Sequence, residues 1–282
     1  RATSMGFGLH AFHYAVAGSV QDVKIFAKLL AAAPNAGNTP STIGGIMPWM
    51  YLNYYAKSVI HPETQERDPG FSNQAIQRAA LFVINSSKEV LMTISPDDKF
   101  MEASSWHQDE DLTKLCKPYY TDIVSLGVDL MTSKAAFRVI ETLCQLVPKL
   151  IKSYRVPSHS LTPFFGSNVV HMLVGWSDLP NLANVDIDES VRTLRVIHSV
   201  APELFIQENS VKDEGVRGDL PLHLLIHQRP FKRKSGSQYS SWRATSTSFV
   251  DMVSLPLDFD VSAVKVTGSR DQTALHLLCA LR

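Results

Sequence analysis

An apolar pattern with helical spacing occurs five times along this chain of 282 residues, and a proline follows each copy within about one turn. The five copies occupy residues 23–30, 80–92, 137–147, 191–201 and 249–253. The prolines are Pro34, Pro96, Pro148, Pro202 and Pro256, at successive spacings of 62, 52, 54 and 54 residues. Because proline lacks an N–H and disfavours helical geometry in the residue before it, each is expected to stop a helix. The similar intervals predict a helical repeat architecture.

A second recurring element lies between these helices and places a histidine among apolar residues. Its four copies contain His13, His171, His223 and His276. The last three are 52 and 53 residues apart, and His13 precedes His171 by 158 residues, close to three such periods. Two further copies are expected near residues 60–75 and 110–125. The sequences at 73–76 and 117–120 contain no histidine, so both copies are predicted to be degenerate.

These histidine segments resemble ankyrin repeats. Residues 218–224 read GDLPLHL and residues 272–277 read QTALHL, which is similar to the T-P-L-H-x-A signature of that family. The resemblance covers residues 218–228 and 268–282, extends less closely to 8–34 and 167–205, and is weakest over 40–150. It implies a short turn, an inner helix, an outer helix and a projecting loop in each repeat. His13, His171, His223 and His276 would then be structural residues that hydrogen-bond to the loop of the next repeat.

The repeats depart from the ankyrin family in their length. Ankyrin repeats have a period of about 33 residues, whereas the spacing here is near 53. The additional residues are expected to be insertions. One should lie between an inner and an outer helix, because His223 and Phe249 are 26 residues apart whereas His13 and Val23 are only 10 apart.

We therefore expect an all-α fold, an ankyrin-type helical solenoid of about five helix pairs with inserted loops and a truncated sixth pair. The chain, residues 1–282, would form a single elongated domain in which residues 40–150 carry degenerate repeats. Because no outer helix follows the last histidine segment, we also expect these residues to be a fragment of a longer chain. A divergent α-solenoid of another family is the alternative fold.

Three groups of residues have the composition of a chemical site, and each has a simpler interpretation. His223 and His227 have zinc-protease spacing, but Leu224 replaces the required glutamate. Residues 107–111 contain one histidine and three carboxylates, His107, Asp109, Glu110 and Asp111, yet such close neighbours cannot all converge on one metal, so a solvated loop is favoured. Residues 158–160, Ser-His-Ser, are adjacent in sequence and therefore seldom face one another. We expect a protein that is not an enzyme, with no catalytic residues, metal or cofactor.

The segment 229–243 is the strongest candidate for partner binding, with five basic, three aromatic and no acidic residues. The candidate contact residues are Arg229, Lys232, Arg233, Lys234, Tyr239, Trp242 and Arg243, together with Trp176 in another inserted segment. Three interpretations compete: a solvated insertion, a docking arm for an acidic or phosphate-bearing protein, and a basic targeting signal or phosphorylation site around Ser235. The spacing of Trp49, Leu52 and Ala56 instead predicts a buried helix stripe.

Charge and cysteine content limit the partner and the compartment. Lysine plus arginine equals aspartate plus glutamate, 27 each, so the net charge does not indicate a nucleic-acid partner. The three cysteines, Cys116, Cys144 and Cys279, are too widely spaced for a disulfide framework or a zinc knuckle, which favours a reducing intracellular compartment without defining the organelle. No apolar run approaches the ~20 residues of a transmembrane helix.

The sequence therefore predicts a non-catalytic protein–protein interaction or scaffolding module. Its partner would be another protein, with an acidic surface if the basic segment is the contact. The alternative is a structural accessory subunit that is built permanently into a large assembly. A third class, an enzyme whose catalytic domain lies outside these residues, would require a catalytic motif elsewhere in the full-length sequence.

Overall fold

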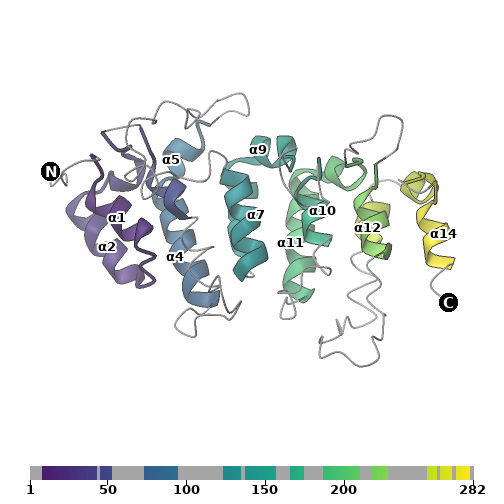
Figure 1. Ribbon diagram of the computed structural model, residues 1–282, viewed down its shortest axis with the longest axis horizontal. Helices are drawn as coiled ribbons and strands as arrows, with labels where there is room; N and C mark the ends of the chain where they lie inside the picture. The colour runs from purple at the N-terminus through teal and green to yellow at the C-terminus, as the bar shows by residue number, and fades with distance from the viewer. Residues whose placement is uncertain are drawn as a thin grey trace, which may run out of the picture. The chain divides into compact units, whose positions relative to one another are not determined.

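The computed structural model (Figure 1) is mostly helical. It describes residues 8–42, 45–52, 73–94, 123–134, 137–156, 166–174, 187–209, 218–227, 253–258, 261–268 and 271–279. In these ranges the only β pairing is an isolated antiparallel bridge between Thr267 and Thr273. The predicted all-α class is confirmed. Within the described ranges, every helix is too short or too polar to cross a bilayer.

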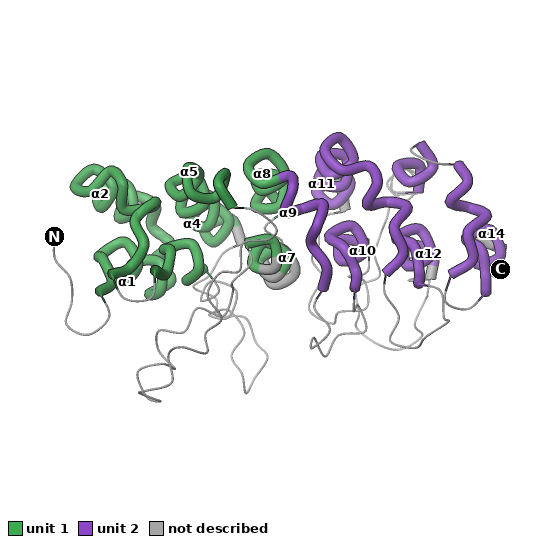
Figure 2. Tube along the Cα trace, turned by 90° about the horizontal axis from the view of Figure 1, so that it is seen from above, with its two compact units in different colours: residues 1–147 green, residues 148–282 purple. Residues whose placement is uncertain are grey.

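The chain divides into two compact units, Arg1–Val147 and Pro148–Arg282, which are coloured separately in Figure 2. Each unit has its own set of helices that contact one another. The expectation of one continuous domain stays a prediction.

The first unit is built from helices in two contacting rows. Its elements are α1 (Ala11–Ala17), α2 (Val23–Ala32), η1 (Ala36–Asn38), η2 (Pro48–Leu52), α4 (Asn73–Ser86), α5 (Lys88–Leu91), α7 (Ile123–Lys134) and α8 (Phe137–Leu146). In the first row α1 contacts η2, which contacts α7, and in the second row α2 contacts α4, which contacts α8. The rows are joined because α1 packs on α2, η2 on α4, and α7 on α8.

The second unit repeats this arrangement. Its elements are α9 (Pro148–Ser153), α10 (Val169–Val174), α11 (Ile187–Val200), η5 (Pro202–Phe205), α12 (Pro221–His227), a helical stretch at residues 253–258, η6 (Val261–Lys265) and α14 (Ala274–Cys279). In the first row α10 contacts α12, which contacts α14, as Figure 2 shows. In the second row α11 packs on α10, and Val253 and Leu257 of the 253–258 stretch pack against a core cluster that includes Leu222.

Amphipathic spacing accounts for the second-row helices. In α8 the buried residues are Phe137, Val139, Ile140, Leu143 and Cys144, which form one apolar face. Aromatic contacts join these helices: the rings of Phe12 in α1 and Phe26 in α2 lie 5.5 Å apart between the rows, and those of Phe26 and Phe82 lie 6.0 Å apart within the second row. This packing, rather than intrinsic propensity, stabilises helices as short as α1.

The prolines behave differently from one another. Pro34 follows α2 as expected, whereas Pro148 and Pro202 begin α9 and η5, where the missing N–H costs nothing. Pro256 lies inside the helical stretch 253–258, so the prediction that it stops a helix is wrong. Pro96 lies outside the described residues.

The degenerate copies of the histidine segment are also placed differently from the prediction. Asn73 opens the second-row helix α4, so residues 73–76 are not a first-row copy. The first-row position belongs to η2, which is buried throughout, including Trp49 and Leu52 at 0% exposure. The predicted burial of these two side chains is confirmed. Ala56 and residues 117–120 lie outside the described residues.

A close backbone approach joins η1 to the end of α4. A Cβ added to Gly37 would clash with the backbone carbonyl and the hydroxyl of Ser86. The buried Ser87 hydroxyl donates a 2.7 Å hydrogen bond to the Gly37 carbonyl, which holds the two segments together.

We expect Gly37→Ala to lower the free energy of unfolding by about 3 kcal/mol, because the backbone must move apart. Gly45→Ala is the matched control, since Gly45 has a φ of +62° but open space around its Cβ position. That variant should lose only about 1 kcal/mol, from backbone strain. Urea unfolding measures both. Equal losses would contradict the close approach.

Candidate functional site

The four signature histidines occupy the same position, the third residue of a first-row helix. They are His13 in α1, His171 in α10, His223 in α12 and His276 in α14. In each, the ring Nδ1 accepts a hydrogen bond from the backbone N–H three residues earlier, at 3.3, 3.3, 3.0 and 3.3 Å respectively. The ring therefore satisfies one of the backbone N–H groups that a helix start leaves unpaired.

The other ring nitrogen of three of these histidines reaches toward the next helix pair. The Nε2 atom of His13 lies 2.9 Å from the carbonyl oxygen of Ile46, that of His171 lies 2.9 Å from Asp219 O, and that of His223 lies 3.0 Å from Val266 O. Because Nδ1 accepts, the neutral imidazole carries its proton on Nε2 and donates it to these carbonyls. The structural role predicted for the signature histidines requires hydrogen bonds of this kind, which His13, His171 and His223 form.

Each accepting carbonyl belongs to a turn that precedes the next first-row element. Ile46 O also accepts the N–H of Ser41 at 2.8 Å, and Asp219 O also accepts the N–H of Asn209 at 3.0 Å. In each of these two turns, one carbonyl oxygen therefore accepts two hydrogen bonds, one that closes the turn and one from the preceding histidine. Two similar closures occur at Val156 with Ser167 and at Gly268 with Gln272. We call these four hydrogen-bonded closures the turn stems.

Burial determines the protonation state of the three bridging histidines. Each is 0% exposed. Desolvation lowers the pKa of His13 and of His171 to about 4, against opposing hydrogen bonds to Ile46 and Asp219. Desolvation also lowers the pKa of His223. All three rings are therefore neutral at physiological pH, as a donor to a carbonyl and an acceptor from an amide must be.

A left-handed residue stands five positions before the histidine in three of the four segments. These residues are Gly8 (φ 59°), Gly166 (φ 70°) and Asp271 (φ 54°). Gly45, with a φ of 62°, stands in the same relation to Met50 of η2. The segment 45–52 is therefore a fifth copy, with methionine in place of histidine. The sequence signal for this copy is a glycine followed three residues later by a proline, as in the signature at 218–221.

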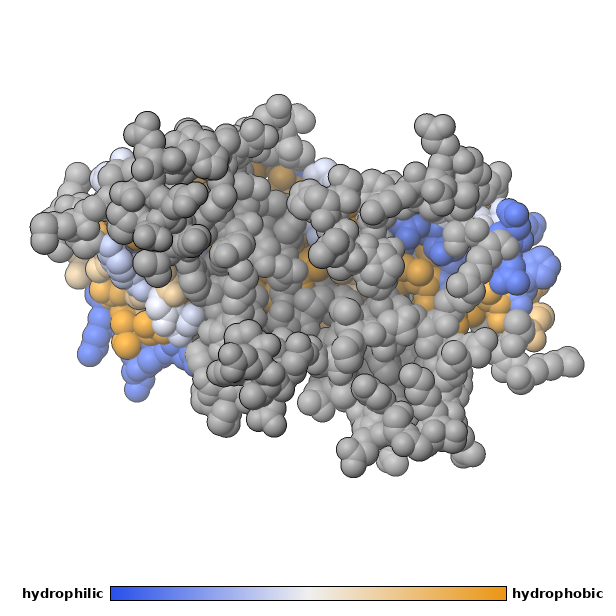
Figure 3. Space-filling model, in the orientation of Figure 1, coloured by the Kyte–Doolittle hydropathy of each residue, from blue (hydrophilic) through white to orange (hydrophobic). Residues whose placement is uncertain are grey.

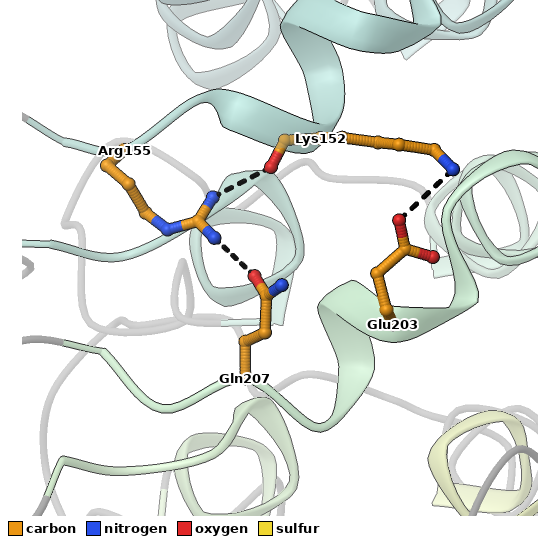
Figure 4. Close-up of polar contacts among 4 residues, drawn as sticks. All are labelled: Lys152, Arg155, Glu203 and Gln207. Atoms are coloured by element: carbon orange, nitrogen blue, oxygen red, sulfur yellow. Dashed lines mark hydrogen bonds and ion pairs between the residues drawn. The ribbon is translucent and has the colours of Figure 1, made fainter.

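In the second unit, polar contacts join α9 and the residue Arg155 that follows it to η5 and the residue Gln207 that follows it (Figure 4). Lys152 of α9 forms a 3.1 Å ion pair with Glu203 of η5. The Arg155 guanidinium donates to the Lys152 carbonyl at 3.1 Å and to the side-chain oxygen of Gln207. The Lys152–Glu203 pair is substantially exposed on both sides, so it contributes little stability on its own.

The separation in sequence between these partners is informative. Lys152 and Glu203 are 51 residues apart, and Arg155 and Gln207 are 52 apart. In the first unit Asn38 and Glu89, 51 apart, are joined by a 3.3 Å hydrogen bond. Contacts at this separation are those expected when successive copies of a repeat near 53 residues long pack directly on one another.

The predicted partner-binding residues are not placed. The eight candidate contact residues all lie outside the described residues: Arg229, Lys232, Arg233, Lys234, Tyr239, Trp242, Arg243 and Trp176. Residues 107–111 and 158–160 lie outside them as well. In the described part of the chain no group of three or more histidine, cysteine or carboxylate side chains could hold a metal ion. Both ring nitrogens of His223 are engaged by the backbone, which removes it as a zinc ligand.

Two cysteines have contrasting environments. Burial, with a smaller contribution from Glu141, raises the pKa of the Cys144 thiol to about 12, so this residue behaves as a core apolar group. Cys279 in α14 is exposed. Neither forms a disulfide, and Cys116 lies outside the described residues.

No protein-family model, no curated protein and no solved structure matches this chain.

Proposed function

We propose that this chain is a protein–protein interaction module built as an ankyrin-type stack of helix pairs. One observation carries the proposal: in three helix pairs a buried histidine donates from Nε2 to a carbonyl of the following turn. This is the hydrogen bond that the ankyrin resemblance implies. The contacts between copies 50 to 52 residues apart support the same stacking.

The hydrogen-bonded stems suit recognition because they immobilise the bases of the turns. The Asp219 carbonyl accepts from both the buried His171 ring and the Asn209 N–H, so movement of this stem would break two hydrogen bonds. A partner that binds residues emerging from such stems meets a surface whose supports are already ordered, which lowers the entropic cost of binding.

The basic segment 229–243 follows α12 directly and is our proposed contact for an acidic protein surface. Its arginine, tyrosine and tryptophan residues belong to the types that supply most of the binding energy in protein interfaces. Its five cations would raise the association rate with an acidic partner, and this effect should weaken as salt screens the charges.

The test compares three forms of the protein as baits in cell lysate. The wild type is run beside a variant in which Lys232, Arg233, Lys234 and Arg243 become serine. The matched control replaces four exposed cations of the helices, Lys24, Lys28, Arg138 and Lys149, with serine.

We expect a partner that the wild type and the control retain and the 229–243 variant loses, with capture falling as salt is raised. A specific partner retained equally by all three baits would assign binding to the turns instead. An insoluble or aggregated wild-type chain that becomes soluble only with co-expressed proteins would favour the permanent-subunit alternative.

A further inference from the structure

One peptide group of the second unit takes part in the hydrogen bonds of two signature histidines. The Asp219 carbonyl oxygen accepts the Nε2–H of His171 at 2.9 Å, and it also accepts the N–H of Asn209 at 3.0 Å. The N–H of the same peptide group belongs to Leu220, and it donates to Nδ1 of His223 at 3.0 Å. The histidines of α10 and α12 therefore bind opposite edges of a single peptide group.

The succession of hydrogen bonds continues beyond His223. Its Nε2–H donates to the carbonyl oxygen of Val266 at 3.0 Å, in the turn before α14. The succession thus runs from His171 through the Asp219–Leu220 peptide group and His223 to Val266, and we call it the histidine relay. Helix α10 contacts α12, and α12 contacts α14, so the relay joins helices that are also neighbours.

Two physical effects make the bonds of the relay depend on one another. A peptide group is planar, so its oxygen and its hydrogen move as one rigid body, and a rotation that lengthens one hydrogen bond disturbs the other. A carbonyl that accepts hydrogen bonds also polarises its peptide group, which makes the N–H a stronger donor. Because His171 and His223 are each 0% exposed, water does not replace a bond that is lost.

The surroundings leave this peptide group little freedom to move. A Cβ added to Gly268 would clash with the Asp219 carboxylate and would come within 3.2 Å of Nδ1 of His223. The Asp219 N–H is held by the side-chain oxygen of Asn209 at 2.6 Å. The turn at Gly268 therefore packs directly against the relay, and both backbone polar groups of Asp219 are hydrogen-bonded.

The first unit contains the first half of this arrangement without the second. His13 donates to the Ile46 carbonyl at 2.9 Å, but Met50 occupies the position that His223 occupies in the second unit. A methionine side chain has no ring nitrogen to accept a backbone N–H. Among the described residues, only the peptide group at 219–220 joins two imidazoles.

We propose that the histidine relay makes α10, α12 and the turn at Val266 open and close as one cooperative unit. Loss of the bond at His171 weakens the bond at His223, and the reverse also holds, because coupling between two sites is reciprocal. Ordering of the turn at Asp219 is thereby transmitted to the next helix pair. The proposal goes beyond partner recognition and holds whether or not residues 229–243 bind a protein.

Apolar packing is the competing source of coupling between these helices. One buried cluster joins α12, η6 and α14, and hydrophobic residues are visible over α12 and α14 in Figure 3. The members of this cluster are Leu220, Leu222, Ile226, Ala263, Ala274 and Leu277. A variant that changes only packing is therefore needed beside variants that change the hydrogen bond.

The test measures amide hydrogen exchange of the 282-residue chain by NMR. His171→Leu keeps about the same side-chain volume but removes the donor, whereas His171→Gln keeps a side-chain N–H. Leu173→Ala is the packing control, because Leu173 lies in the same helix, is 1% exposed and takes no part in the relay. The readout is the protection of the Leu220 N–H relative to the slowest-exchanging amides of the second unit. The Ser41 N–H, which closes a turn of the first unit, is the internal reference.

We expect His171→Leu to lower the relative protection of the Leu220 N–H about tenfold and to leave that of the Ser41 N–H unchanged. His171→Gln and Leu173→Ala should each leave the relative protection of the Leu220 N–H within about twofold of the wild type. In the first variant the donor is retained, and in the second the relay is intact.

A double-mutant cycle measures the same coupling in the unfolding equilibrium. Because His171→Leu and His223→Ala remove links of one relay, the double variant should be less destabilised than the two single variants predict, by about tenfold in the unfolding equilibrium constant. His13→Ala combined with His223→Ala is the matched control. Their hydrogen bonds lie in different units, so their effects should multiply within about twofold.

Two results would overturn the proposal. One is equal protection of the Leu220 N–H in His171→Leu and His171→Gln. The other is a loss in Leu173→Ala as large as that in His171→Leu, which would assign the coupling to packing. If His171→Leu does not fold, His223→Ala tests the reverse direction: it should lower the relative protection of the Asn209 N–H about tenfold, and unchanged protection there would also overturn the relay.

Discussion

Replacing His223 with alanine is expected to lower the free energy of unfolding by about 4 kcal/mol. The substitution removes the acceptor for the Leu220 N–H and the donor to the Val266 carbonyl, two hydrogen bonds of 3.0 Å at a site with 0% exposure. Each orphaned backbone group costs about 1–3 kcal/mol, and the lost ring volume adds a cavity. Urea unfolding followed by circular dichroism measures the loss.

The matched control is His276→Ala, which changes the same position of the same motif. His276 is exposed, and among the described residues the hydrogen bonds of its ring are confined to Thr273 of its own turn. We expect a loss of about 1 kcal/mol or less. If the two substitutions cost the same, the bridge from His223 to Val266 does not stabilise the second unit.

Acidification is expected to destabilise the fold between about pH 6.5 and pH 4. Burial lowers the pKa of His13 and of His171 from 6.5 to about 4. In this window the unfolded chain binds more protons than the folded chain, so the free energy of unfolding falls as the pH falls. The stability that the two neutral rings contribute is fully present above the unfolded pKa of 6.5. Each ring should cost about 2 kcal/mol by about pH 5, and the lowered pKa of His223 acts in the same direction.

The urea midpoint measured at several pH values between about 7.5 and 5 tests this expectation. His171→Ala is the control: it should be less stable at neutral pH but lose less on acidification, because one titrating ring is gone. Desolvation raises the pKa of the Glu203 carboxyl, but its own backbone hydrogen bond and Lys152 lower the pKa on balance, so this group loses its contribution only below its ordinary pKa of 4.5. A midpoint that does not change above pH 5 would contradict the burial of neutral imidazoles.

The local pattern predicts much of the helical framework. The helices α2, α8 and α11 lie where apolar residues recur at helical spacing, and the four histidine segments begin α1, α10, α12 and α14. These features depend on interactions within one or two helical turns, which the sequence order itself specifies. The error at Pro256 has a related cause: proline does not stop a helix when it lies in the first turn, and Pro256 is the fourth residue of the described stretch 253–258.

The copy at residues 45–52 lacks the histidine that marks the other segments. Met50 occupies the histidine position there, and the segment adopts a 3-10 helix whose side chains are all buried. What this copy shares with the others is the left-handed glycine, Gly45. Any glycine can adopt a positive φ, but most glycines do not need one, so the presence of a glycine in the sequence predicts a positive φ only weakly.

By itself, the sequence determined the helical class and the position of the signature histidines in their helices, while a repeat near 53 residues stays a prediction. Only the tertiary structure decided what those histidines do. Their acceptors lie 33, 48 and 43 residues away, at Ile46, Asp219 and Val266, and the lengths of the intervening loops differ. A hydrogen bond across such distances exists only once the helix pairs are packed. The same packing removes water from the imidazoles, which is why their lowered pKa values follow from the fold rather than from local sequence.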